Sequence, residues 1–217
     1  MNVLGISGSP RQRSNSHLLL EQALAPFAEA GWDVQVLRLR DLDIHPCLAC
    51  DHCRSHPGSC AQHDDMGGFY EAFRSCDALL IASPVYSRSV CAQLVCVFDR
   101  HYAVNVERPL TGKPGGAIAV GADEGGGQAI TVMAIYNWLL SCGAIAVPGE
   151  LNGLTARASA EGEILGQEKR LRQARVLGSN VLDIAATLLA NKQLEQASRE
   201  GVMDAIGNQA GSPTANG

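Results

Sequence analysis

Short, mostly apolar runs alternate along the chain with longer stretches of helical periodicity. Runs of four or five such residues are typical of strands buried on both faces of a parallel sheet, and they occur at residues 3–6, 34–37, 78–82, 116–120 and 144–147. Apolar residues recur at the spacing of an α-helix over residues 18–27, 66–73, 90–102, 128–141 and 164–189. In the last of these helices we expect a break or bend at Gly178-Ser179.

Strands that alternate with helices predict an α/β fold. We expect a doubly wound, five-stranded parallel sheet with helices on both faces, right-handed crossovers and the flavodoxin-like strand order 2-1-3-4-5. Residues 1–190 would form this single domain, with a cysteine-rich loop at 45–63. The hydrophobic periodicity is lost after residue 191, so residues 191–217 are predicted to be a partly disordered extension.

Composition and charge exclude several classes of protein. The 217 residues are 46% hydrophobic and 18% charged, with a formal net charge of −5, so we expect no nucleic-acid partner. There is no run of about 18 apolar residues and no basic segment before an apolar one, so we expect neither a membrane span nor a signal peptide. The eight cysteines then indicate the reducing cytoplasm, where cysteines serve as ligands, catalytic groups or core residues.

Four of these cysteines lie close together in one segment. It reads C-L-A-C-D-H-C-R-S-H-P-G-S-C and contains Cys47, Cys50, Cys53 and Cys60. Three thiols at three-residue intervals, followed by a fourth after a short loop, suit a cubane iron–sulfur cluster. Zinc sites more often pair two C-x2-C knuckles across a longer spacer.

Other interpretations of this segment stay open. The thiols could be reduced or disulfide-linked without metal, or could hold zinc in a zinc-stabilised binding module. Four of the six histidines lie in or beside the segment: His45, His52, His56 and His63. They form either a solvated polar loop or part of a mixed Cys/His site. The other cysteines have apolar neighbours and are expected to be small core residues: Cys76, Cys91, Cys96 and Cys142.

The loop between the first strand and the first helix is rich in hydrogen-bond donors. It reads G-S-P-R-Q-R-S-N-S over residues 8–16. Backbone N–H groups and the positive end of a helix converge at such a loop and can hold a phosphate. The fingerprints G-x-x-x-x-G-K and G-x-G-x-x-G are both absent, which argues against a nucleoside-triphosphate or dinucleotide loop. The plain alternative is a helix N-cap at Ser14 or Asn15.

Four motifs together carry a family resemblance over residues 1–190. Residues 7–16 resemble the FMN-phosphate loop of the flavodoxin-like NAD(P)H-dependent FMN reductases, and the S-P-V-Y of residues 83–86 resembles the loop along their isoalloxazine ring. The next helix ends in a matching Asp99-Arg100. The cysteine segment followed by Asp64-Asp65-Met66 resembles the iron–sulfur flavoprotein branch. Where relatives often carry a lysine after the ring loop, this chain has Val95 and Cys96.

The resemblance implies a set of cofactor contacts. The FMN phosphate would be bound by Ser9, Arg11, Ser14, Asn15 and Ser16. The flavin ring would be lined by Pro84, Val85, Tyr86, Ser87 and Arg88. Its pyrimidine edge would be approached by Gly121, Ala122, Gly125, Gly126 and Gly127. A 4Fe-4S cluster would be held by Cys47, Cys50, Cys53 and Cys60. No acid or base stands out, and the only candidates are His101, Tyr102 and Asp123.

We therefore expect an FMN-dependent oxidoreductase with an iron–sulfur cluster. It would pass electrons between NAD(P)H or a ferredoxin-type protein and a small organic acceptor, because a flavin exchanges two electrons and a cluster exchanges one. Two alternatives stay open: a flavin dehydrogenase specific for one biosynthetic intermediate, similar to the aminodeoxyisochorismate type, and a non-enzymatic electron-transfer protein. The resemblance also implies a homodimer or homotetramer.

Overall fold

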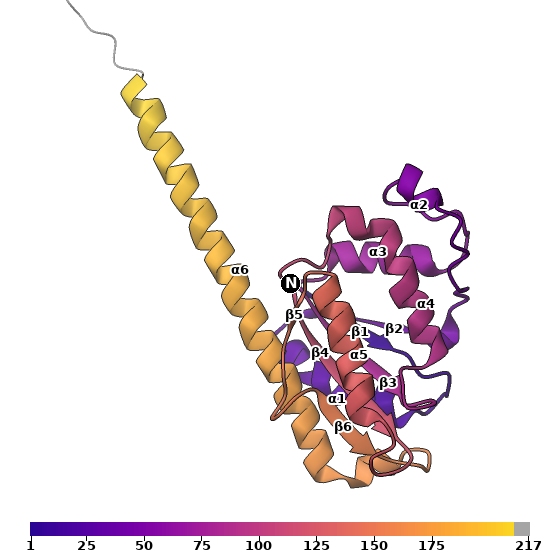
Figure 1. Cartoon of the computed structure of the whole chain (residues 1–217). Helices are drawn as coiled ribbons and strands as arrows, with labels where there is room; N and C mark the ends of the chain where they lie inside the picture. The colour runs from indigo at the N-terminus through magenta and orange to yellow at the C-terminus, as the bar shows by residue number, and fades with distance from the viewer. Residues whose placement is uncertain (211–217) are drawn as a thin grey trace, which may run out of the picture.

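A parallel β-sheet runs through the middle of the molecule (Figure 1). The computed structural model describes the backbone of residues 1–210 and the side chains of residues 1–199. The strand order is β2-β1-β3-β4-β5, with β6 also paired to β4 and every pairing parallel. The strands are β1 (Asn2–Ser7), β2 (Asp33–Arg38), β3 (Ala78–Pro84), β4 (Pro114–Gly121), β5 (Ile145–Ala146) and β6 (Leu154–Arg157). The predicted fold class and strand order are confirmed.

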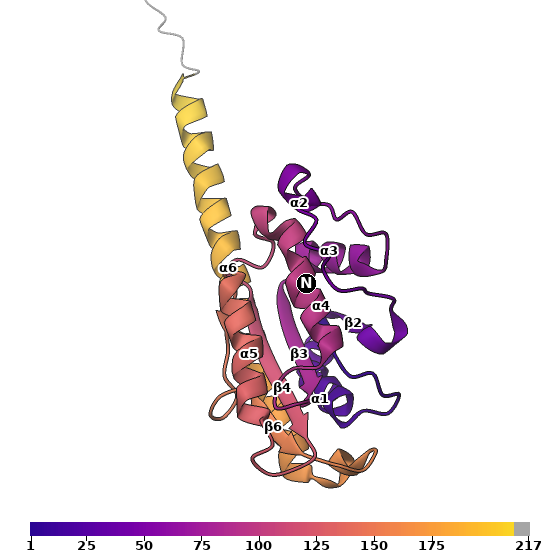
Figure 2. The same cartoon turned by 45° about the vertical axis from the view of Figure 1, so that its right-hand side comes forward.

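Helices cover both faces of the sheet, and a separate hydrophobic core lies between the sheet and the helices on each face. One core lies under α1 (Asn15–Glu29) and α6 (Glu168–Ala210), and the other lies under α3 (Met66–Ser75), α4 (Ala92–Arg100) and α5 (Gln128–Ser141). Figure 2 shows α4 and α5 side by side over the sheet. The remaining helical segments are α2 (His52–Ser55) and the 3-10 turns Leu39–Asp41, His101–Glu107 and Glu163–Gly166.

The structure differs from the sequence-based expectation at the C-terminal end of the domain. The run at 144–147 contributes only the two-residue β5, and β6, which was not predicted, pairs with the rest of β4 from Ile118 to Gly121. The last helix begins at Glu168 rather than 164 and passes Gly178 without interruption, so the predicted break is wrong. It continues to Ala210, so residues 191–210 are helical, and residues 211–217 lie outside the described residues.

The parallel sheet decides where ligands can bind. Because all strands point the same way, the loops that follow β1, β3, β4 and β6 meet at one edge. The cysteine segment leaves β2 at the same edge of the sheet and then crosses toward α3 and α4 (Figure 1). In the part of the chain that is described, no helix is both long enough and apolar enough to span a bilayer.

Candidate functional site

A cavity at the carboxyl edge of the sheet collects the phosphate-loop residues. Loops after four strands line it, and nine of the predicted FMN contacts are among its walls: Ser9, Arg11, Ser14, Asn15, Ser16, Pro84, Val85, Tyr86 and Ala122. These residues come from loops that are distant in sequence. The sheet topology therefore brings the predicted phosphate loop and the predicted ring loop into one site.

The start of α1 is built to present hydrogen-bond donors to an anion. Ser14 is the N-cap, and its hydroxyl accepts from the backbone N–H of His17 at 3.5 Å. The hydroxyls of Ser14 and Ser16 lie 2.8 Å apart, and the Ser9 hydroxyl accepts from the N–H of Arg11 at 3.2 Å. No acidic side chain lies in the first turn of α1 to compete for its positive end. Buried hydroxyls at a free helix start fit the phosphate of FMN.

Asn15, a predicted phosphate contact, makes two hydrogen bonds that the sequence motif does not show. Its side-chain amide donates to the carbonyl of Ala160 at 2.8 Å, and its side-chain oxygen accepts from the N–H of Ile164 at 3.2 Å. It therefore fastens the loop after β6 against the phosphate loop. Sequence reasoning missed this side of the cavity because β6 was not recognised. The additional lining residues are Arg13, Val120, Ala158, Ser159 and Glu161.

The predicted ring loop closes in a two-residue turn. The backbones of Tyr86 and Ser89 exchange hydrogen bonds of 3.0 and 2.9 Å. The two residues between them, Ser87 and Arg88, have φ of +48° and +63°, a conformation that is uncommon for residues with a side chain. The N–H of Val85 donates to the carbonyl of Val120 at 2.8 Å, which ties this loop to β4. Tyr86 is 38% exposed and lines the cavity.

The glycine-rich loop after β4 packs directly on this turn. Gly127 has φ of +108°, and a Cβ on it would lie 2.6 Å from Cα of Arg88, so only glycine fits. Three of the predicted contacts, Arg88, Gly125 and Gly127, line a neighbouring cavity and not the cavity that contains the phosphate loop. The other three predicted contacts line neither of these cavities: Ser87, Gly121 and Gly126. A Cβ on Gly121 would meet the side chain of Gln128 at 2.7 Å. All of these flavin contacts stay predictions.

The four clustered cysteines line a single cavity of about 460 Å³. Cys47 and Cys50 are exposed, Cys53 and Cys60 are partly buried, and all four are free thiols. Among the described residues no three Cys, His, Asp or Glu side chains converge tightly enough to hold a single metal ion. Four thiols are the number and kind of ligand that a 4Fe-4S cluster takes, so the donor set of this cavity fits such a group.

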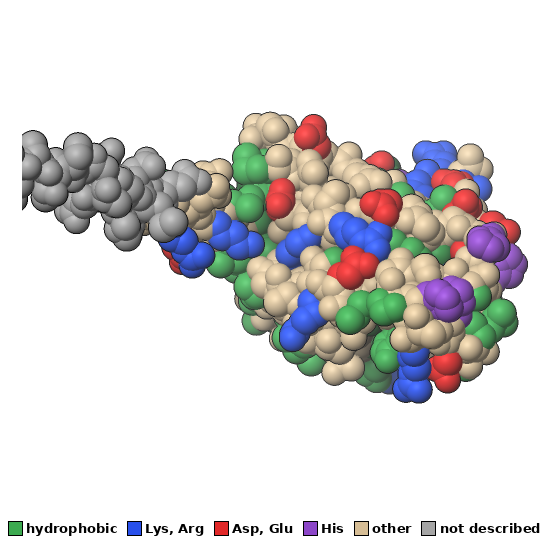
Figure 3. Space-filling view, turned by 90° about the horizontal axis from the view of Figure 1, so that it is seen from above, with side chains coloured by type: hydrophobic (Ala, Val, Ile, Leu, Met, Phe, Trp, Pro, Cys, Tyr) green, Lys and Arg blue, Asp and Glu red, His purple; other side chains and the backbone are tan. Residues whose placement is uncertain are grey.

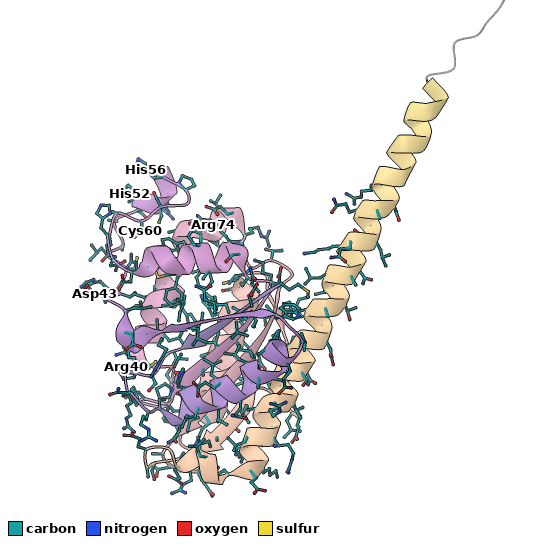
Figure 4. All side chains as sticks on the ribbon, turned by 180° about the vertical axis from the view of Figure 1, so that it is seen from behind. Arg40, Asp43, His52, His56, Cys60 and Arg74 are labelled. Carbon is teal, nitrogen blue, oxygen red and sulfur yellow. The ribbon has the colours of Figure 1, made fainter. Side chains whose placement is uncertain are left out.

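The backbone of this segment is unusual between the first cysteines. Ala49 and Asp51 have φ of +50° and +56°, and the N–H of Ala49 donates to the sulfur of Cys47 at 3.4 Å. His52 begins α2 and His56 directly follows it, and their rings stack with centroids 4.2 Å apart. Figure 3 shows histidine side chains gathered at the end of the molecule opposite the projecting helix, and Figure 4 labels His52 and His56 above Cys60.

An ion pair lies beneath the cysteine segment. Arg100 and Asp64 are in contact, and their side chains are 1% and 3% exposed. Burial alone would raise the pKa of Asp64, but hydrogen bonds from Arg100 and from two backbone N–H groups lower it to about 2. Burial would likewise raise the pKa of the Cys60 thiol, whereas the N–H of Gln62 and the guanidinium of Arg100 lower it below its usual value. This corner of the site favours a thiolate on Cys60.

None of the three acid–base candidates lies in the phosphate-loop cavity. His101 is buried next to Phe73 and Trp138, Tyr102 lines the cysteine cavity, and Asp123 accepts from the Gln128 side chain through its backbone carbonyl. The structure therefore supports none of them as an acid or base at the flavin.

Comparisons with known proteins show the family of this chain. The sequence model of the NADPH-dependent FMN reductase family matches residues 1–156. An iron–sulfur flavoprotein of Methanocaldococcus jannaschii is 36% identical over 188 residues, which cover 85% of this chain and 97% of the relative. An iron–sulfur flavoprotein of Methanosarcina thermophila is 35% identical over 148 residues, which cover 68% of this chain and 77% of the relative.

A solved structure supports the fold independently. RosB, crystallised with the intermediate 8-demethyl-8-formylriboflavin-5′-phosphate, superimposes with a TM-score of 0.71 at 18% identity, covering 93% of this chain and 87% of RosB. At that identity the likeness shows the fold alone, whereas the family match and the relatives concern the sequence itself. The chain belongs to the NADPH-dependent FMN reductase family and is a flavin-dependent oxidoreductase.

Proposed function

We propose that this oxidoreductase carries FMN and a 4Fe-4S cluster and passes electrons from NAD(P)H or a ferredoxin-type protein to a small organic acceptor. The observation that carries the proposal is the cysteine cavity, where four free thiols of one segment line one space. The names of the two archaeal relatives, both iron–sulfur flavoproteins, support it. When bound, FMN would supply two-electron chemistry and the cluster one-electron chemistry.

The position of α4 supports communication between the two sites. This helix begins at Ala92, just after the predicted ring loop, and ends at Arg100, which lines the cysteine cavity. Its nine residues make it about 14 Å long at the usual rise per residue. The residues around the flavin would bind and orient it, and the buried hydroxyls at α1 would hold its phosphate.

The test is a chemical analysis of protein purified without oxygen, for iron, sulfide, zinc and flavin, together with a visible spectrum. We expect about one FMN and about four iron per chain. Cys53→Ser should lose most of the iron and keep FMN, because it removes one of the four thiols in the cavity. The matched control is Cys96→Ser, on α4 and outside that cavity, which should keep both.

The other results are equally informative. FMN without iron in the anaerobic preparation would contradict the cluster and leave a simple flavin reductase. Zinc without flavin would contradict the whole proposal and favour a zinc-stabilised binding module. Bleaching of the bound flavin by NADPH in a stopped-flow experiment would support NADPH as donor, and its absence would favour a ferredoxin-type donor.

A further inference from the structure

Arg100 makes more contacts with the cysteine segment than an ordinary ion pair requires. It is the last residue of α4 and is 2% exposed. One terminal nitrogen, Nη1, donates to the Asp64 carboxylate and to the carbonyl of His45 at 3.2 Å. The other, Nη2, donates to the sulfur of Cys60 at 3.5 Å. The planar fork of an arginine can serve three acceptors in this way because its donors are fixed relative to one another.

Asp64 holds the other side of this arrangement. Its Oδ2 accepts from the backbone N–H of His45 at 3.0 Å, and its Oδ1 accepts from the N–H of Met66 at 3.2 Å. The neighbouring Asp65 accepts from the N–H of Asp43 at 2.7 Å. The two arms of the cysteine segment, before Cys47 and after Cys60, therefore meet at the Arg100–Asp64 pair.

We propose that Arg100 is the positioning residue of the cysteine site. Its side chain holds both arms of residues 43–65 against α4, and it places an N–H donor on the sulfur of Cys60. The second part rests on the cluster proposed above. An N–H donor on a ligand sulfur stabilises the more negative, reduced form of a bound cluster and raises its reduction potential. Arg100 ends the helix that begins beside the ring loop, so the anchor also fixes the cysteine site relative to the flavin site.

The plain alternative is an ion pair that only stabilises the fold. A conservative substitution of Arg100 distinguishes this alternative from the proposed positioning role. Arg100→Lys keeps the positive charge beside Asp64, so no buried charge is left uncompensated. The single ammonium cannot reach Asp64, the His45 carbonyl and the Cys60 sulfur at once. As a second variant that leaves no charge at all, Arg100→Met combined with Asp64→Asn removes the pair together. The control is Arg175→Lys on α6, which pairs with Glu29 of α1 on the other face of the sheet from α3 and α4.

The first measurement is hydrogen exchange of the full-length apoprotein with reduced thiols. We expect amides in residues 43–65 to exchange about tenfold faster in Arg100→Lys than in the wild type, as for the loss of a charge-assisted hydrogen bond. Amides of α1 should exchange at the wild-type rate. The second measurement is a redox titration of the reconstituted protein followed by electron paramagnetic resonance. The cluster midpoint potential should move to a more negative value, and the FMN potentials should stay where they are.

Each outcome decides the proposal. Local exchange at the wild-type rate, or equally accelerated exchange in α1, would overturn the anchoring role. Accelerated local exchange with an unchanged cluster potential would overturn the hydrogen bond to the Cys60 sulfur as a determinant of potential. A wild-type chain that takes up no iron under anaerobic reconstitution would overturn the proposed cluster and the effect on potential with it. The exchange data on the apoprotein would still decide whether Arg100 anchors the segment.

Discussion

His101 is an ionisable side chain placed among aromatic rings. Its ring meets Phe73 and Trp138 edge-on, with centroids 5.4 Å away in both cases. Its Nδ1 lies 3.6 Å from the sulfur of Cys142, and its Nε2 is buried with no hydrogen-bond partner among the described residues. Burial lowers the pKa of His101 to about 4, so the folded protein holds this imidazole in its neutral form at neutral pH.

This environment predicts an acid-sensitive contribution to stability. The unfolded chain binds a proton at His101 below about pH 6.5, whereas the folded chain resists it down to about pH 4, so stability is lost as the pH falls between these values. Between pH 7 and 4.5 the free energy of unfolding should fall by about 2 kcal/mol more in the wild type than in His101→Phe. Urea unfolding at both pH values measures this difference.

A control at an exposed histidine separates this effect from general acid destabilisation. His63→Phe, outside the core, should leave the wild-type pH dependence in place. If His101→Phe lost stability as steeply as the wild type over the same interval, the buried imidazole would not be the group responsible.

At the scale of elements, the packing of α6 on α1 explains a glycine that the sequence alone misreads. Gly178 lies within α6, and a Cβ there would overlap the backbone carbonyl of Ala23 on α1. Glycine inside a helix usually lowers the stability of that helix, and Gly178 was the reason for the predicted break. Here it permits close approach of two helices whose contact is otherwise made by buried apolar side chains such as Leu20 and Leu177.

Gly178→Ala should therefore destabilise the protein, although alanine is the better helix former. We expect the free energy of unfolding to fall by about 1–3 kcal/mol, as for an overpacked core, and thermal or urea denaturation measures it. The matched control is Gly67→Ala in α3, where a Cβ meets nothing within 4 Å. That variant should gain up to about 1 kcal/mol from helix propensity. Equal stabilisation of both variants would contradict the close packing.

At the scale of the whole molecule, α6 extends well past the domain on which it packs (Figure 1). Its fully buried side chains are Ala174, Leu177, Val181 and Ala185, whereas residues 191–199 are exposed. Within the described side chains, residues 191–199 therefore add nothing to the buried core. Assembly into homodimers or homotetramers stays a prediction, and this exposed helix is where it could be tested.

A chain ended at Ala190 should keep the fold and its FMN. Because surface changes away from the core alter stability by about 0.5 kcal/mol or less, Tm should stay within about 2 °C of the full-length value. A chain ended at Gln173, which lacks the buried part of α6, should fail to fold. A much larger fall in Tm for the chain ended at Ala190 would contradict the lack of packing at residues 191–199 and would point to packing against a second copy in solution.

The sequence by itself determined the repeating strand–helix order, the N-cap at the loop after β1 and the cysteine spacing, because periodicity, capping and ligand spacing are local properties of the chain. It also carried the family resemblance, which the family match confirms. Only the tertiary structure decided that β6 completes the sheet, that Asn15 binds the loop at Ala160, and that Gly178 serves a helix contact. It also brought Arg100 to Cys60. These features depend on residues distant in sequence, and chain folding alone brings such residues together.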